Sequence, residues 1–182
     1  MKLNNLFANT ANKVLALAAA VMMMGMTFTA CSSDNDDTPK FTNTVTIDGE
    51  VIKIKKSELN KVEGYYVLGM ILETGGKATD ILIVLNNSTL NNKLIDLTHQ
   101  IESSANSWSI SAQKDANKLF CGQDVKNEKF KFSGGAMKLD INPTTKEVEV
   151  TVTGGKINTP TDTKQGDGQE HTISISYKGT AE

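Results

Sequence analysis

The stretch Glu147-Val148-Glu149-Val150-Thr151-Val152-Thr153 decides the fold. Its valines alternate with charged and hydroxyl residues, and this period of two places every valine on one face of a β-strand. Alternation with one wet face is typical of antiparallel sheets, which pack their other face against a core. Residues 147–153 therefore predict an antiparallel strand.

Further strands are predicted on both sides of this stretch. Asp48-Gly49 lies between Val45–Ile47 and Val51–Ile54 and predicts a two-residue hairpin turn, because both turn positions tolerate a positive φ. Two runs that are apolar on both faces, Tyr65–Leu72 and Asp80–Leu85, predict central strands covered on each side. The alternation of residues 147–153 recurs in Trp108–Gln113, Phe130–Ser133, Met137–Ile141 and Thr172–Tyr177.

Short strands joined by Gly and Pro turns predict an all-β fold over residues 41–182, a single antiparallel β-sandwich or calycin-like barrel. Three segments are less regular. We expect a loop or one helical turn at Lys56–Gly64, a short strand near Leu94–Thr98 within irregular chain, and a long exposed loop at Gly154–Glu170.

The N-terminus carries a different pattern. Lys2 and Lys13 are followed by the apolar run Val14–Met26, which is short for a bilayer span of about 20 residues. The run ends near the small residues Thr29-Ala30-Cys31. This order predicts a secretory signal over 1–30 that is cleaved before Cys31. Residues 31–40 are polar and acidic, and they predict a disordered tether.

The junction Phe28-Thr29-Ala30-Cys31 resembles the lipobox of bacterial lipoproteins, although Phe28 stands where an aliphatic residue is usual. Ser32–Asp37 resembles the acidic export signal of surface lipoproteins of the Bacteroidota. The resemblance implies a lipid on Cys31 that binds the outer membrane, display toward the exterior, and a small β-domain of unknown function. An acidic tether that any lipoprotein can carry is the alternative interpretation of the Asp run.

Composition argues against nucleic acid as a partner. Without the two lysines of residues 1–30, the chain has 17 basic and 21 acidic residues, a formal net charge of −4. Every basic residue is lysine, whereas recognition of phosphate groups favours the bidentate guanidinium of arginine.

The residue pattern also predicts no enzyme, no cofactor and no metal site. Cys121 has no histidine nearby in sequence, since the only histidines are His99 and His171. The acidic residues Asp162, Asp167 and Glu170 do not follow the spacing of a calcium-binding loop and are interpreted as a solvated loop.

Three aromatic residues are candidates for ligand binding. Trp108 lies on a predicted strand, in the core or on a binding surface. Tyr65 and Tyr66 are adjacent and point to opposite faces, so one of them reaches the outside and could stack on a sugar or a protein. We therefore expect a binding or structural domain for an unknown glycan or protein. The alternatives are a calycin-like carrier of a small apolar ligand, and an adhesive subunit that assembles through an open sheet edge.

Overall fold

The computed structural model describes residues 40–62, 64–73, 79–85, 88–99, 108–114, 117–123, 131–159 and 166–182, and all structural statements below concern these ranges. The chain divides into two units, residues 1–39 and Lys40–Glu182. The second unit is all-β and has no α-helix in the described ranges. Cys31 and the predicted tether lie outside the described residues.

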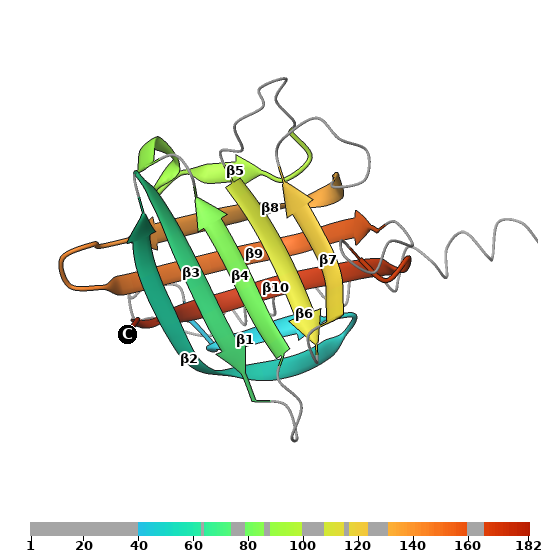
Figure 1. Ribbon diagram of the computed structural model, residues 1–182, viewed down its shortest axis with the longest axis horizontal. Coiled ribbons are helices and arrows are strands. Elements are labelled where there is room, and N and C mark those ends of the chain that lie inside the picture. The colour runs from blue at the N-terminus through green and yellow to red at the C-terminus, as the bar shows by residue number, and fades with distance from the viewer. Residues whose placement is uncertain are drawn as a thin grey trace, which may run out of the picture. The chain divides into compact units, whose positions relative to one another are not determined.

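All ten strands belong to one antiparallel sheet in the order β5-β8-β9-β10-β1-β2-β3-β4-β6-β7 (Figure 1). Their bounds are β1 Thr44–Ile47, β2 Glu50–Val62, β3 Tyr65–Leu72, β4 Thr79–Leu85, β5 Leu94–Asp96, β6 Trp108–Lys114, β7 Asn117–Gln123, β8 Phe132–Ile141, β9 Glu147–Asn158 and β10 Glu170–Thr180. In the described part of the chain, the 3₁₀ turn Ser88–Leu90 precedes β5.

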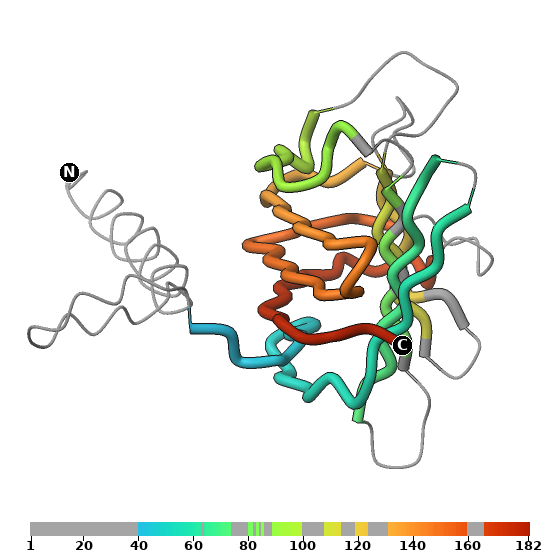
Figure 2. Tube along the Cα trace, turned by 90° about the vertical axis from the view of Figure 1, so that its left-hand side faces the viewer, coloured from blue at the N-terminus to red at the C-terminus, as the bar shows by residue number. Residues whose placement is uncertain are grey.

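Strand β2 turns this one sheet into two layers. Its first half pairs with β1, its second half pairs with β3, and the register shifts between Ile54 and Lys56 where the strand bends. Figure 2 shows β2 passing from one layer to the other. The back layer holds β5, β8, β9, β10 and β1, and the front layer holds the second half of β2 with β3, β4, β6 and β7. The strands of the two layers cross, and the curled sheet forms a half-barrel.

The half-barrel is open between the two ends of the sheet: β7 on the front layer, and on the back layer the short strand β5 with the part of β8 that β5 does not cover. We call this the open side. Elsewhere each strand pairs with its neighbours, and β10 closes the back layer onto β1. The open side is therefore the place where side chains, rather than a ladder of backbone hydrogen bonds, must join the layers.

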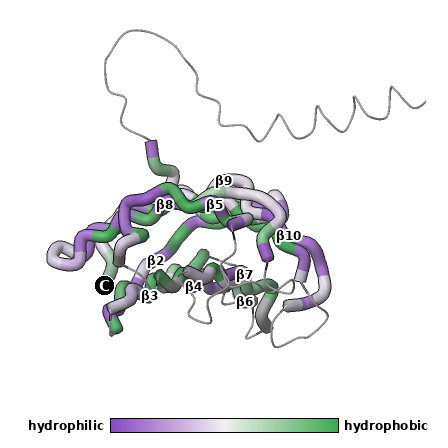
Figure 3. Tube along the Cα trace, turned by 90° about the horizontal axis from the view of Figure 1, so that it is seen from above, coloured by the Kyte–Doolittle hydropathy of each residue, from purple (hydrophilic) through white to green (hydrophobic). Residues whose placement is uncertain are grey.

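The core lies between the layers. In β9 the valines 148, 150 and 152 are buried and Thr151 is partly exposed, which confirms the predicted facing of this strand. The buried apolar side chains of both layers form one cluster that includes Leu68, Ile83 and Leu139. Figure 3 shows the two layers facing each other, with hydrophobic residues recurring along their strands. The all-β prediction is confirmed.

The predicted hairpin and the short strand are also confirmed. Asp48 and Gly49 have φ values of 51° and 84°, as a two-residue turn between β1 and β2 requires. Strand β5 covers Leu94–Asp96, within the segment expected to contain a strand.

Two loop predictions were wrong. Residues 56–62 are not a loop, because β2 continues to Val62 after its bend and buries Ser57 and Leu59. Strand β9 runs four residues past Gly154 to Asn158, and Ile157 is fully buried. The outer face of β3 is partly exposed, so this central strand is not covered on each side as expected.

Candidate functional site

Aromatic rings join the two layers along the open side. Trp108 of β6 and Phe132 of β8 have ring centroids 6.0 Å apart, and Phe120 of β7 lies 6.4 Å from Phe132. The ring of His171 in β10 lies 5.7 Å from Phe120. Each contact links a front strand to a back strand, at distances typical of favourable ring pairs. We call these four residues the aromatic row.

A glycine makes room for the aromatic row. A Cβ atom on Gly122 of β7 would lie 1.9 Å from Cε2 of Phe132, so only a residue without a side chain fits beneath this ring. Phe132 is itself fully buried. The close approach of β7 and β8 across the open side therefore depends on Gly122.

His171 lies at one end of the row with both ring nitrogens bonded to carboxylates. Its Nδ1 is 2.8 Å from Oδ2 of Asp48, and its Nε2 is 2.9 Å from Oδ1 of Asp167. The residue is 5% exposed. A carboxylate oxygen only accepts hydrogen bonds, so both contacts are hydrogen bonds when both ring nitrogens carry a proton, which is the positively charged form of the imidazole. We call these three residues the histidine cluster.

The charges of the histidine cluster reinforce one another. Burial lowers the pKa of His171, but the hydrogen bonds and charges of Asp48 and Asp167 outweigh it, so the pKa is raised. For Asp167, burial alone would raise the pKa of the carboxyl group. The hydrogen bonds that it accepts from His171 and from the Gln169 amide outweigh burial, so its pKa is lowered. The cation of His171 and the anion of Asp167 stabilise each other.

The cluster could not be found from the sequence. Asp48 is 123 residues from His171, and only the pairing of β1 with β10 brings the hairpin turn beside the ring. Asp167, expected in a solvated loop, instead binds His171, and Glu170 pairs with Lys156 at 3.1 Å. Asp162, the third acidic residue considered for calcium, lies outside the described residues.

The buried polar groups of the described ranges are held by hydrogen bonds. With both ring nitrogens of His171 protonated, each donates to a carboxylate. The buried hydroxyl of Ser57 lies 2.7 Å from the hydroxyl of Tyr177, and that of Thr159 donates to the carbonyl of Gln169. These polar groups satisfy one another inside the fold.

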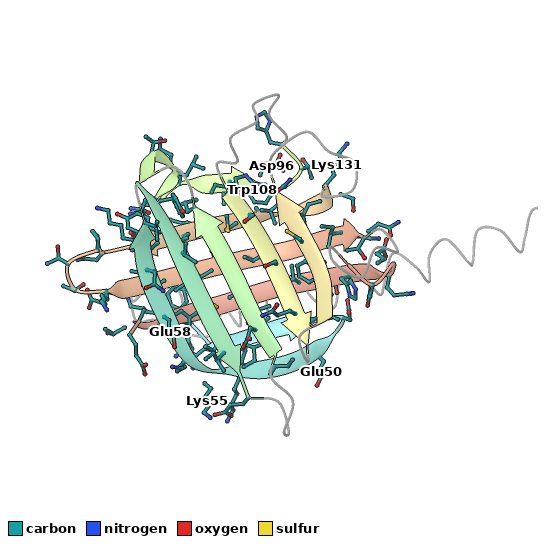
Figure 4. The ribbon with its side chains drawn as sticks, viewed as in Figure 1. Glu50, Lys55, Glu58, Asp96, Trp108 and Lys131 are labelled. Carbon is teal, nitrogen blue, oxygen red and sulfur yellow. The ribbon has the colours of Figure 1, made fainter. Side chains whose placement is uncertain are left out.

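The three aromatic candidates lie in different surroundings. Trp108 is 3% exposed and belongs to the core, at the end of the sandwich that also carries Asp96 and Lys131 (Figure 4). Tyr66 is 7% exposed and points inward, with the ammonium of Lys61 5.9 Å from its ring centroid. Tyr65 is partly exposed on the outer face, so the prediction that the two tyrosines point to opposite faces is confirmed.

Tyr65 begins an apolar stripe on the outer face of the front layer. Val67, Gly69 and Ile71 follow it at alternate positions of β3, and each is partly exposed. Val62, which pairs with Tyr65 across the β2–β3 hairpin, is 42% exposed. This stripe is the outward-facing surface on which a ligand would meet aromatic and aliphatic side chains.

Comparison of the chain with known protein families, curated proteins and solved structures finds no match. Within the described ranges, no helix has the length and apolar character needed to span a bilayer. No cluster of three or more His, Cys, Asp or Glu side chains suited to hold a metal ion is found in the same ranges.

Proposed function

We propose that this chain is a lipoprotein of the bacterial outer membrane whose β-domain binds a glycan or protein at the cell surface without catalysing a reaction. The lipid on Cys31 would be the anchor, and residues 31–40 the tether. The observation that carries the binding function is the apolar stripe on β3, with Tyr65 as its aromatic residue.

The outer faces of the two layers differ in how their apolar side chains are arranged. The exposed Val51 and Leu94 of the back layer lie on separate strands, β2 and β5, whereas the apolar residues of the front layer follow one strand, β3. The back layer presents hydroxyl groups in a row, since Thr44 pairs with Ser176 and Ser176 pairs with Thr151. Beside this row, Lys178 and Glu149 form an ion pair. Such a surface is ordinary for a solvated sheet. A contiguous apolar stripe on an outward face, in contrast, is typical of an interaction site.

The point where the chain enters the domain supports this assignment. Thr42 donates its amide hydrogen to Oγ of Ser176 at 3.1 Å, and the ring of Phe41 lies 5.9 Å from Nζ of Lys178. Both partners face outward from the back layer, and Figure 2 shows the first described residues arriving on that side. The chain therefore enters the domain on the back layer, and the apolar stripe of β3 lies on the front layer.

The close packing of the interior favours a ligand on the outer surface of the domain over a ligand inside it. Inward-facing side chains of both layers belong to a single hydrophobic cluster, and Met70, Ile81 and Met137 are fully buried in it. A carrier of an apolar ligand would use this interior space for the ligand. We therefore place the ligand on the outer face of β3.

The test is a binding screen of the full chain in detergent against soluble polysaccharides such as xylan and glucans, and against mucin. We expect Tyr65→Ala to weaken binding roughly 5-fold to 100-fold, the usual effect of removing an interface anchor. Thr46→Ala, on the outer face of the back layer, is the matched control and should bind like the parent protein. Binding that Thr46→Ala reduces and Tyr65→Ala leaves intact would contradict the assigned face.

A further inference from the structure

The two carboxylates of the histidine cluster are held with unequal strength. Asp48 is fixed twice besides its bond to His171, because its amide donates to the carbonyl of Thr172 at 3.1 Å and its Oδ1 accepts the amide of Thr172 at 2.8 Å. These bonds tie the β1–β2 turn to β10. Asp48 would therefore stay in place without the charge of the imidazole.

Asp167 lies in the turn of residues 166–169, whose later residues are bonded to Thr159. The amide of Gly168 donates to Oγ1 of Thr159 at 3.1 Å, and the carbonyl of Gln169 accepts from the amide and the hydroxyl of Thr159, each at 3.1 Å. Asp167 itself has fewer attachments outside the turn. Its amide donates to the carbonyl of Leu119 on β7 over 3.3 Å, a long bond. Its Oδ1 accepts the amide of Gln169, which belongs to the same turn. The bond to His171 is thus the main link between the Asp167 carboxylate and the rest of the domain.

Among the residues that the structure describes, two charged groups are bonded to the ring of His171. The β1–β2 turn contributes Asp48 and the 166–169 turn contributes Asp167. Strand β7 contributes the uncharged ring of Phe120, and β9 pairs Ile157 with His171 in register. Lys156 of β9 and Glu170 of β10 are engaged with each other.

We infer that His171 is a pH-sensitive latch: with both ring nitrogens protonated it holds Asp167 of the 166–169 turn against β10 and the β1–β2 turn, and loss of one ring proton releases Asp167, while Thr159 continues to hold Gly168 and Gln169. A neutral imidazole keeps one N–H group and presents a lone pair at the other nitrogen. The remaining proton stays on Nδ1, facing the fixed carboxylate of Asp48. The lone pair of Nε2 then faces Asp167, and the two repel each other.

Release of Asp167 weakens the contact between the two layers at the open side of the half-barrel. The bond from Asp167 to Leu119 joins the turn before β10 to β7, a front-layer strand. When Asp167 moves away, this link between the layers is lost, and the aromatic row remains to hold β7. The open side thus stays closed while Asp167 is ionised and His171 is protonated, and alkaline media loosen it.

The latch can be tested by nitrogen NMR of the full chain in detergent between pH 5 and pH 10. We expect both imidazole nitrogens of His171 to be protonated at pH 7, and one proton to leave with a midpoint above the ordinary value of 6.5. The amide signals of Asp167 and Gly168 should shift with the same midpoint. The amide of Thr172, bonded to Asp48, should shift much less.

Asp167→Asn removes the negative charge of the side chain that the latch releases. It should therefore lower the pH at which half of the His171 rings have lost one proton. Asp140→Asn makes the same chemical change on β8, away from the cluster, and should leave the midpoint unchanged. Titration of His171 at or below pH 6.5 would overturn the inference, and so would amide signals of Asp167 and Gly168 that stay fixed while the ring loses its proton. If Asp167→Asn does not fold, the NMR titration of His171 in the parent protein still tests the inference.

Discussion

At the scale of single residues, the packing of the core depends on small residues that leave room for large side chains. Gly122 is the clearest case, because the ring of Phe132 occupies the space that any side chain there would need. Gly69 on β3 is its opposite, with no atom within 4 Å of the position of a Cβ atom. The two glycines therefore offer a matched pair of substitutions.

We expect Gly122→Ala to lower the free energy of unfolding by ~1–3 kcal/mol, since overpacking a core forces rings off their preferred positions. Gly69→Ala should change it by less than ~0.5 kcal/mol. Denaturant unfolding of the two variants measures the difference. Equal midpoints for the two would show that Phe132 does not lie over Gly122.

Cys31 is the residue on which the proposed location depends. Replacing Cys31 by Ala should abolish labelling of the protein by a metabolic fatty-acid probe, because the thiol is the proposed acceptor of the lipid. Cys121→Ala removes the only other thiol and should leave labelling intact. Labelling that survives Cys31→Ala would refute the lipid anchor.

At the scale of elements, β9 has one buried face and one partly exposed face, so the same substitution should have different effects at neighbouring positions. Val150→Asp places a charge without a partner in the core, which costs several kcal/mol and approaches the net stability of a domain. Thr151→Asp introduces the same side chain on the partly exposed face and should have little effect. Thermal unfolding distinguishes them, and a register error of one residue would exchange the two results.

The elements that the sequence predicts well are those whose signal is local. The Asp48-Gly49 turn and the valine alternation of β9 depend on neighbouring residues only, and both are confirmed. The second half of β2 escaped prediction because a polar residue, Ser57, takes an inward position there and bonds to Tyr177. A serine at a core position hides the alternation that would otherwise mark a strand.

The candidate site was predictable only in part, for a similar reason. That Tyr65 and Tyr66 face opposite sides follows from the geometry of one strand. Which of them faces outward depends on how the layers stack, and the histidine cluster depends on the pairing of β1 with β10. Contacts between residues more than 100 positions apart leave no periodic trace in the chain.

At the scale of the whole molecule, the acidic tether is proposed to direct the domain to the exterior. Replacing Asp34, Asp36 and Asp37 by Ala should leave fatty-acid labelling unchanged and reduce cleavage by protease added to intact cells. After lysis, the variant and the parent should be cleaved equally. Intact cells in which the variant is cleaved as fast as an accessible parent would show that the tether carries no export information.

Stability against pH follows from the histidine cluster. The raised pKa of His171 stabilises the fold fully below about pH 6.5, the unfolded value, and this stabilisation is lost as pH rises through the folded value. The lowered pKa of Asp167 contributes stability above about pH 4 that is lost on acidification. The unfolding free energy of the parent relative to Asp167→Asn should therefore be largest between about pH 4 and 6.5, as measured by urea unfolding. A difference that does not vary with pH would contradict the coupling.

The position of β1 has a mechanical consequence. Strand β1 follows directly on the segment through which the chain enters. With the proposed membrane anchor and a bound ligand, a pull along the chain would therefore reach β1 after the contacts of Phe41 and Thr42. An edge strand loaded in this way could be peeled off one bond at a time. Strand β1 instead lies inside the sheet, with four residue pairs to β10 and four to β2. Two ladders share the load, which would help the domain to resist shear under the proposed attachment to a cell surface.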